Sequence, residues 1–183
     1  MQADLLSVAG MAGRICVGLV FGLAAFDKML HWPVLEGVIR NYRLLPRMLV
    51  RPAAHALPPV ELAISLALLA GVGLFPAVAS AIMLLLIFAL AMAINIRRGR
   101  RYIDCGCHQS FLRQVVRPAL VARNVVLIGI LSASLASPSI PPPGMQIVGL
   151  ATGVAFFLFY LVANTIAALP TLDEPSLMPE LSS

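Results

Sequence analysis

Five long apolar stretches restrict the fold of this sequence more than any other feature. A membrane-spanning helix needs about 20 predominantly apolar residues, and five stretches reach that length. They lie near residues 5–29, 57–74, 76–96, 118–136 and 145–168. The expected fold is all-α. It is a polytopic integral membrane bundle of about five transmembrane helices, in which the first four form the core and one C-terminal helix is added.

The composition indicates that this chain lies in a lipid bilayer. Hydrophobic residues make up 60% of the 183 residues and charged residues 11%, with a mean hydropathy of +0.94. Soluble domains contain about 45–50% apolar and about 25% charged residues, so a soluble enzyme and a disulfide-stapled secreted domain are excluded. We expect one membrane-embedded domain over residues 1–168, followed by a disordered tail over 169–183 that contains several prolines and acids.

Basic residues are concentrated in two of the links between the apolar stretches. Of the 13 Lys and Arg residues, all but Arg14 and Arg123 lie in these links, at positions 28, 40, 43, 47 and 51 and at positions 97, 98, 100, 101, 113 and 117. With five spans both links share one face, and the positive-inside rule places that face in the cytoplasm. The prediction is a multi-pass protein of the bacterial inner membrane, with the N-terminus outside and the C-terminus in the cytoplasm. This placement also explains the net charge of +5 without a nucleic-acid partner.

The first basic link contains an amphipathic segment. After Trp32-Pro33, apolar residues recur at helical spacing through Tyr42, and Arg47, Arg51 and His55 then recur every four residues. We expect an interfacial segment that leads into the second membrane helix and contacts lipid headgroups. A functional anion site is the alternative interpretation.

Several polar residues fall within the apolar stretches, where an ionisable group needs a partner or a function. By helical rise, five of them share one depth near the basic face: Asp27, Glu61, Asn95, Arg123 and Asn124. We predict an ion pair between Glu61 and Arg123, completed by the two asparagines. The layer specifies helix packing or forms a proton path or headgroup site. Arg14, in the outer half of the first helix, has no evident partner in the sequence.

The most informative local motif is Cys105-Gly106-Cys107 in the second basic link. The reactive form of cysteine is the thiolate, which neighbouring cations favour, and arginines surround this pair in sequence. A disulfide across so small a ring is strained and labile, which suits thiol exchange with another protein. The two alternatives are a pair without chemistry and a metal site with Asp104 and His108, although four adjacent residues form a poor tetrahedral site. Cys16 lies in an apolar helix and is expected to behave as a small hydrophobe.

Several motifs resemble, in the same order, those of the MauE family of methylamine-utilisation membrane proteins, within the wider DoxX-like group. They are Arg14, Asp27-Lys28, Tyr42-Arg43-Leu44-Leu45-Pro46, Leu57-Pro58-Pro59-Val60-Glu61-Leu62, Asn95-Ile96-Arg97-Arg98-Gly99-Arg100, Ile103-Asp104-Cys105-Gly106-Cys107 and Arg123-Asn124. The resemblance covers about residues 10–130. It implies a DoxX-like four-helix core and a role in making methylamine dehydrogenase. The partners it implies are MauD, a thioredoxin-like protein, and the small (beta) subunit of the dehydrogenase, which contains many disulfides.

The leading hypothesis is a membrane redox factor that supports disulfide formation in the small subunit, with Cys105 and Cys107 as the catalytic pair. The alternatives are a non-enzymatic assembly or export anchor and a thiol:quinone oxidoreductase. Only the thiol:quinone oxidoreductase would bind a quinone, and no other cofactor or metal is expected. Whether the chain is itself an enzyme stays open. One conflict is visible: the small subunit matures outside the inner membrane, whereas the charge count places both cysteines inside.

Overall fold

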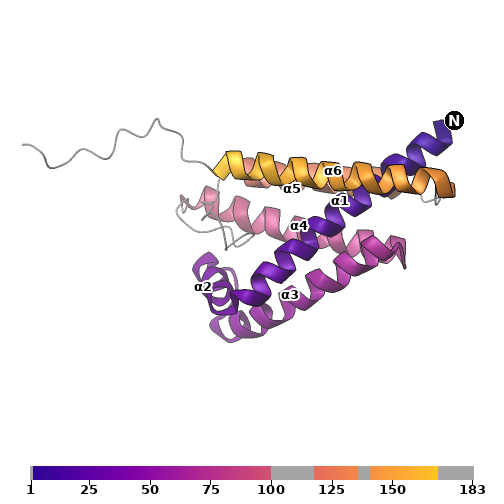
Figure 1. The fold of residues 1–183 in the computed structure, drawn as a ribbon. Coiled ribbons are helices and arrows are strands. Elements are labelled where there is room, and N and C mark those ends of the chain that lie inside the picture. Colours follow the sequence, from indigo (N-terminus) through magenta and orange to yellow (C-terminus); the bar gives the residue numbers. More distant parts are fainter. Residues whose placement is uncertain (1, 100–117, 136–140, 169–183) are drawn as a thin grey trace, which may run out of the picture.

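The computed structural model describes residues 2–99, 118–135 and 141–168, and that part of the chain is built from helices and short turns. The helices are α1 (Gln2–Leu30), α2 (Trp32–Tyr42), α3 (Arg47–Ala70), α4 (Leu74–Arg97), α5 (Pro118–Leu135) and α6 (Pro143–Ala168). All except α2 are long and apolar enough to cross a membrane (Figure 1). The all-α membrane fold expected from the sequence is confirmed. The predicted tail at 169–183 lies outside the described residues.

Helix α1 is the centre of the bundle. It packs against α3, α5 and α6, while α4 closes the other side by packing against α3 and α5 (Figure 1). The main cluster of buried apolar residues comes from α1, α3, α4 and α5: Val17, Phe21, Ile64, Leu68, Ala77, Val78, Ala81, Leu85, Leu127 and Leu131. Helix α6 is the least buried of the five spans, and Tyr160 is its partly buried contribution to this cluster. The four-helix core with one added helix therefore matches the expectation.

Small residues allow α1 to approach its neighbours closely. A Cβ atom added at Gly153 of α6 would lie 2.8 Å from the Cβ of Ile15 and 2.9 Å from the carbonyl oxygen of Ala12. A Cβ added at Gly22 of α1 would lie 2.8 Å from the hydroxyl oxygen of Ser65 on α3. Helices in lipid gain little from the hydrophobic effect when they associate, because the lipid tails are also apolar. Close contact between their backbones provides packing energy instead.

Helix α3 begins at Arg47, ten residues before the start that the Pro58-Pro59 pair suggested. A proline inside a helix has no N–H to donate to the carbonyl four residues earlier, so Pro58 leaves the Ala54 carbonyl without its helical donor. The indole N–H of Trp32 donates to that oxygen at 3.0 Å. A side chain from α2 thus replaces the missing backbone bond, and the helix continues through the prolines.

The connection between α3 and α4 is the tight turn Gly71–Gly73, in which both glycines have positive φ angles of 68° and 55°. These values favour glycine over other residues. The short link makes α3 and α4 an antiparallel pair. Helix α4 begins at Leu74, slightly earlier than expected, because Pro76 is tolerated in the first turn of a helix.

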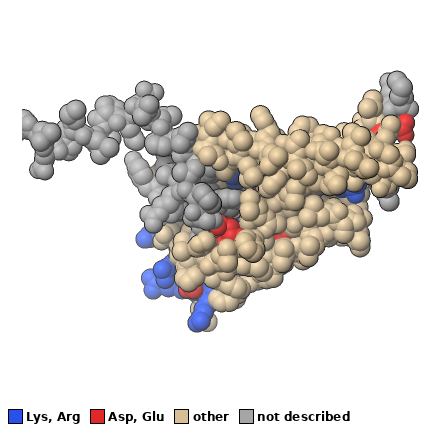
Figure 2. Space-filling view, viewed as in Figure 1, with Lys and Arg blue, Asp and Glu red and all other residues tan. Residues whose placement is uncertain are grey.

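Most exposed Lys and Arg side chains of the described residues lie at the end of the molecule that carries α2 (Figure 2). The N-terminus of α1 lies at the opposite end, and α6 finishes at the α2 end (Figure 1). We call the α2 end the basic end. The link over residues 100–117, which contains the remaining basic residues and both cysteines of the Cys-Gly-Cys motif, lies outside the described residues.

Candidate functional site: a buried polar layer near the basic end

A buried ion pair joins α1 to α3. The ammonium nitrogen of Lys28 lies 2.6 Å from Oε1 and 2.7 Å from Oε2 of Glu61, so it donates to both carboxylate oxygens. Both residues are almost inaccessible, with 3% of Lys28 and 1% of Glu61 exposed. The ammonium also lies 5.4 Å from the centre of the Phe88 ring on α4. One cation therefore links three helices.

This arrangement gives Glu61 a partner that was not predicted from the sequence. We predicted Arg123 as its ion partner, and the structure shows Lys28 donating to both carboxylate oxygens, while Arg123 lines the same cavity. Lys28 was assigned to the basic link because it lies close to the end of α1. One signal in the sequence could have identified Lys28 as the partner. Lys28 falls within the first apolar stretch, where a charged side chain needs a partner.

The position of Glu61 along its helix is also corrected. It lies fourteen residues after the first residue of α3, about 21 Å along a helix, rather than close to the start of the helix. The prediction was wrong because it began the helix near residue 57. The end of α1 therefore meets the middle of α3.

A cavity of about 40 Å³ lies beside the ion pair. Its polar lining consists of Lys28, Glu61, Arg123, Asn124 and Tyr160, and the apolar lining includes Phe21, Phe88 and Leu127. A water needs roughly 10–15 Å³ of such space, so the cavity has room for about three waters. The structure thus brings three members of the predicted layer (Glu61, Arg123 and Asn124) to one cavity.

Arg123 connects the layer to α6. Its Nη1 donates to Oδ1 of Asn164 at 2.9 Å, and its guanidinium carbon lies 5.9 Å from the centre of the Tyr160 ring. Tyr160 and Asn164 are four residues apart and so face the same side of α6. Neither contact was predicted, because the last apolar stretch contains only scattered polar residues and no motif.

The two asparagines of the layer are buried and only partly satisfied. Asn95 donates from Nδ2 to the Ala91 carbonyl at 3.0 Å, while its Oδ1 accepts no hydrogen bond from the described residues. The Nδ2 of Asn124 likewise has no acceptor among them. Buried polar atoms are usually satisfied by protein or by ordered water. Asn124 lines the cavity, so a cavity water is a suitable acceptor for it.

Asp27, the remaining predicted member of the layer, is buried and directly precedes Lys28 in the chain. One of its carboxylate oxygens lies 3.4 Å from Nδ1 of His31, and the same nitrogen lies 3.0 Å from the Asp27 carbonyl oxygen. The His31 side chain is 40% exposed. This pair therefore connects the buried layer to the surface of the basic end.

Arg14 lies far from this layer, at the opposite end of the bundle. It is buried, and its guanidinium faces Gly71, where α3 ends. A cation is favourable next to the C-terminus of a helix because the carbonyl groups there carry partial negative charge. Cys16, two residues further along α1, is a free and buried thiol. These two residues belong to the packing of α1 rather than to the polar layer.

The candidate catalytic residues Cys105 and Cys107 lie outside the described residues. The structure does describe both anchors of their link, Arg97 at the end of α4 and Pro118 at the start of α5. Asn95 lies two residues before the first anchor, and Arg123 lies five residues after the second, about 8 Å along the helix. The link therefore leaves and re-enters the bundle close to the polar layer.

Comparison with known proteins decides the family. The chain matches the family described as "Methylamine utilisation protein MauE" over residues 6–137, which is more than two thirds of its length.

The chain belongs to the MauE family.

The MauE relatives cover most of this chain. The protein named methylamine utilization protein MauE from Paracoccus denitrificans is 40% identical over 159 residues, covering 85% of this chain and 86% of the relative. The MauE protein from Paracoccus versutus is 38% identical, covering 86% of each chain. The MauE protein from Methylophilus methylotrophus is 33% identical, covering 87% and 86%. No solved structure matches the chain.

The MauE match includes the Lys28–Glu61 ion pair, both cysteines and Arg123, but it ends before α6. Tyr160 and Asn164, which contact Arg123, therefore lie beyond the matched segment. The family assignment places this membrane protein in the methylamine utilisation system. It assigns no reaction to any of these residues.

Proposed function

We propose that this MauE-family protein supports maturation of the small subunit of methylamine dehydrogenase by thiol–disulfide exchange at Cys105 and Cys107. The exchange partner is a thioredoxin-like protein of the MauD type. The observation that carries the proposal is the location of the Cys-Gly-Cys motif. It lies inside the family match, on a link whose two anchors flank a buried polar layer.

The exchange needs no cofactor in this chain. A thiolate of the small subunit attacks the Cys105–Cys107 disulfide, which forms a mixed disulfide and releases one cysteine of the pair. A second thiolate of the subunit then attacks the mixed disulfide. The subunit gains a disulfide, and the pair accepts two electrons and two protons as a dithiol. A disulfide of the thioredoxin-like partner re-oxidises the pair by the reverse exchange.

The polar layer has a supporting role in this proposal. Lys28 and Glu61 join α1 to α3, while Arg123 joins α5 to α6. Of the two helices that anchor the 100–117 link, α5 is held by Arg123, and α4 is contacted by the Lys28 ammonium, which lies over the Phe88 ring. A buried charge pair enforces one arrangement because removing either partner leaves an uncompensated charge. The anchors of the link therefore keep a fixed spacing while the cysteines exchange.

The location of the protein is part of the same proposal. We place it in the bacterial inner membrane with the basic end in the cytoplasm, because the positive-inside rule applies to short links of this kind. The N-terminus then lies outside and the end of α6 inside. With this orientation the cysteine pair and a subunit that matures outside lie on opposite sides of the membrane. The direct exchange described above therefore requires the opposite orientation or a link that can be reached from outside.

The test is replacement of each cysteine in a strain that grows on methylamine. Cys105→Ser and Cys107→Ser should abolish disulfide formation in the small subunit, measured by mass spectrometry of the alkylated subunit. Cys16→Ser is the matched control, because it removes a buried thiol in α1. All three variants should insert into the membrane at equal levels. Normal subunit disulfides in the Cys105 and Cys107 variants would overturn the thiol role and favour a membrane assembly or export anchor.

A further inference from the structure

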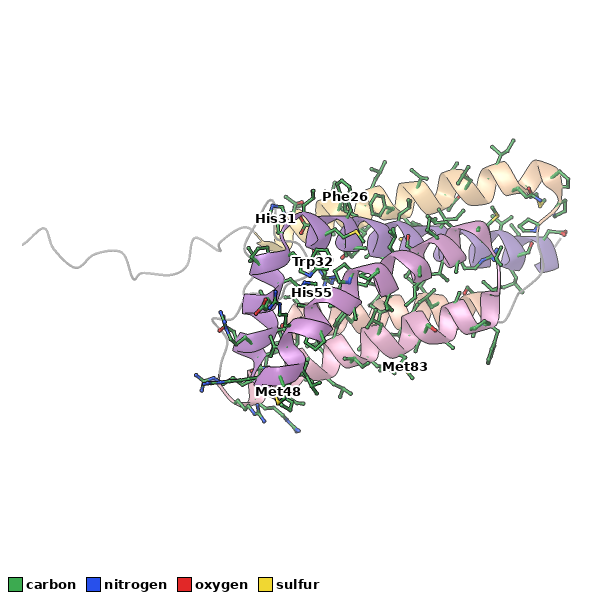
Figure 3. The ribbon with its side chains drawn as sticks, turned by 90° about the horizontal axis from the view of Figure 1, so that it is seen from below. Phe26, His31, Trp32, Met48, His55 and Met83 are labelled. Atoms are coloured by element: carbon green, nitrogen blue, oxygen red, sulfur yellow. The ribbon has the colours of Figure 1, made fainter. Side chains whose placement is uncertain are left out.

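A surface of mixed basic and apolar character covers the connection between α2 and α3. We call it the basic–apolar patch. It consists of the exposed residues Arg40, Arg43, Leu44, Leu45, Arg47, Met48, Leu49 and Arg51. Figure 2 shows blue side chains gathered there, and Figure 3 shows Met48 at the outer edge of the same end. Neither the cysteine chemistry nor the polar layer uses this surface.

The charge of the patch is of one sign. Its four arginines lie within a segment, residues 37–60, that contains no Asp or Glu. Arg47 and Arg51 are one helical turn apart and so lie on the same side of α3. Guanidinium groups present several fixed N–H donors, which match the oxygens of a phosphate group. The complementary partner is therefore anionic and rich in phosphate-type oxygens.

The apolar members of the patch distinguish between anionic partners. Met48 is 89% exposed, and Leu45 and Leu49 are 41% and 51% exposed. Apolar side chains interleaved with arginines are typical of a helix at the membrane interface, where the cations meet headgroups and the apolar groups enter the acyl boundary. An acidic protein segment would satisfy the arginines but leave most of these apolar side chains in water.

The length of α3 places the patch at headgroup depth. From Ala70 back to Arg51 the helix extends about 29 Å, close to the roughly 30 Å of the hydrocarbon layer. Arg47 lies one turn further out. If the turn at Gly71 lies at one boundary of the hydrocarbon layer, the arginines at the start of α3 lie at the other boundary, among the headgroups.

The patch is also held in place before any ligand binds. Trp32 of α2 donates to the Ala54 carbonyl of α3 at 3.0 Å, and its ring lies 4.8 Å from that of His55 (Figure 3). Nδ1 of His55 in turn lies 2.8 Å from the Arg51 carbonyl oxygen. These contacts fix α2 on the first turns of α3. Binding therefore needs little ordering of the backbone.

We infer that the basic–apolar patch binds the headgroups of anionic phospholipids, with Arg43, Arg47 and Arg51 on the phosphates and Met48 and Leu49 among the acyl chains. Lipid binding at this surface fixes α2 in the interface and sets the depth of α3. It is independent of the proposed thiol chemistry, because none of its residues lies on the 100–117 link.

The single tryptophan of the chain, Trp32, is a native reporter beside the patch. The full chain is reconstituted in vesicles that contain brominated phosphatidylglycerol or brominated phosphatidylcholine, and quenching of Trp32 fluorescence is measured. The anionic lipid should quench more strongly. Each arginine near an anionic surface strengthens binding by roughly five-fold, so Arg47→Gln/Arg51→Gln should lower the relative binding constant of phosphatidylglycerol by about 30-fold.

Arg97→Gln/Arg98→Gln is the matched control, because it removes two exposed arginines at the same end but outside the patch. It should keep the preference for phosphatidylglycerol. Arg47→Lys/Arg51→Lys keeps the charge and should also retain the preference, which covers the case in which the glutamine variant fails to fold.

Three results of the quenching experiment would overturn the inference. They are equal quenching by both lipids, an equal loss in the patch and control variants, and a preference that millimolar inorganic phosphate removes. The last result would indicate a site for a soluble anion. Lipid-independent binding of an acidic protein partner at the patch would contradict the inference as well.

Discussion

Lys28, near the end of α1, donates to both carboxylate oxygens of Glu61 in the middle of α3. The two residues are 33 positions apart in the chain, and α2, which lies between them in sequence, contacts both helices. Neither charge could stay in the apolar bundle alone, because the desolvation penalty for an unpaired ion is several kcal/mol. The ion pair therefore fixes how the first and third helices meet.

Removal of one partner of this pair should be strongly destabilising. Glu61→Ala leaves the Lys28 ammonium buried without its carboxylate, and we expect a loss of about 3–5 kcal/mol in unfolding free energy. The double variant Lys28→Met/Glu61→Met removes both charges and keeps the volume, so it should recover most of that loss. Denaturant titration of the purified protein in detergent measures both effects.

Glu36→Ala on α2 is the control, because this carboxylate is partly exposed and should change the stability by only about 0.5 kcal/mol. If the double variant is no more stable than Glu61→Ala, the close pairing of Lys28 with Glu61 does not describe the folded protein.

Trp32→Phe should weaken the first half of α3. The substitution removes the only donor from α2 to the Ala54 carbonyl among the described residues, and a carbonyl left without a partner costs about 1–3 kcal/mol. Pro58→Ala restores a backbone N–H four residues after Ala54. The cost of Trp32→Phe should therefore shrink in the Pro58→Ala background. An equal cost in both backgrounds, measured as a double-mutant cycle, would contradict this account of the proline-containing helix.

Gly153→Ala should loosen the contact between α6 and α1. The new methyl group would lie 2.9 Å from the Ala12 carbonyl oxygen, which belongs to backbone and cannot move aside. Overpacking of this kind costs about 1–3 kcal/mol. Gly144→Ala is the matched control on the same helix, because no atom of the described residues outside its own turn of helix lies within 4 Å of the added methyl group. Equal thermal stability of the two variants would argue against close packing of α6 on α1.

The orientation of the bundle predicts which side of the membrane exposes the thiols. In a Cys16→Ser background, a membrane-impermeant thiol reagent should label Cys105 and Cys107 after permeabilisation and not in intact cells. The reason is the concentration of arginines at the basic end, which the positive-inside rule assigns to the cytoplasm. Labelling of intact cells would mean that the basic end faces outward, and direct exchange with a periplasmic thioredoxin-like protein would then be favoured.

The sequence was sufficient to predict the features that depend on local pattern. Apolar length located the five spans, and helical spacing located α2, whose buried residues are Leu35, Val38 and Tyr42. Helical rise also placed Glu61, Arg123 and Asn124 at one depth, and they now line one cavity. These predictions succeed because each needs only the periodicity of one segment.

Features that depend on tertiary contacts could not be predicted in the same way. Two cations were available for Glu61, and only the crossing of α1 and α3 brings Lys28 against it. The start of α3 was misplaced because proline normally ends a helix, and the compensating donor, Trp32, is distant in sequence. The contact of Asn164 with Arg123 likewise depends on where α6 docks.

The most direct test of the thiol proposal is capture of the exchange intermediate. A cell that carries only one cysteine of the pair, with Cys107→Ser or Cys105→Ser, cannot complete the second exchange, so a mixed disulfide should accumulate. Acid-quenched samples on a non-reducing gel, followed by mass spectrometry, identify the attached protein. The account predicts that one of the two variants carries a thioredoxin-like protein or the dehydrogenase small subunit through its remaining cysteine. If neither variant forms such an adduct, while both proteins are present and the variants are inserted, Cys105 and Cys107 do not perform thiol exchange.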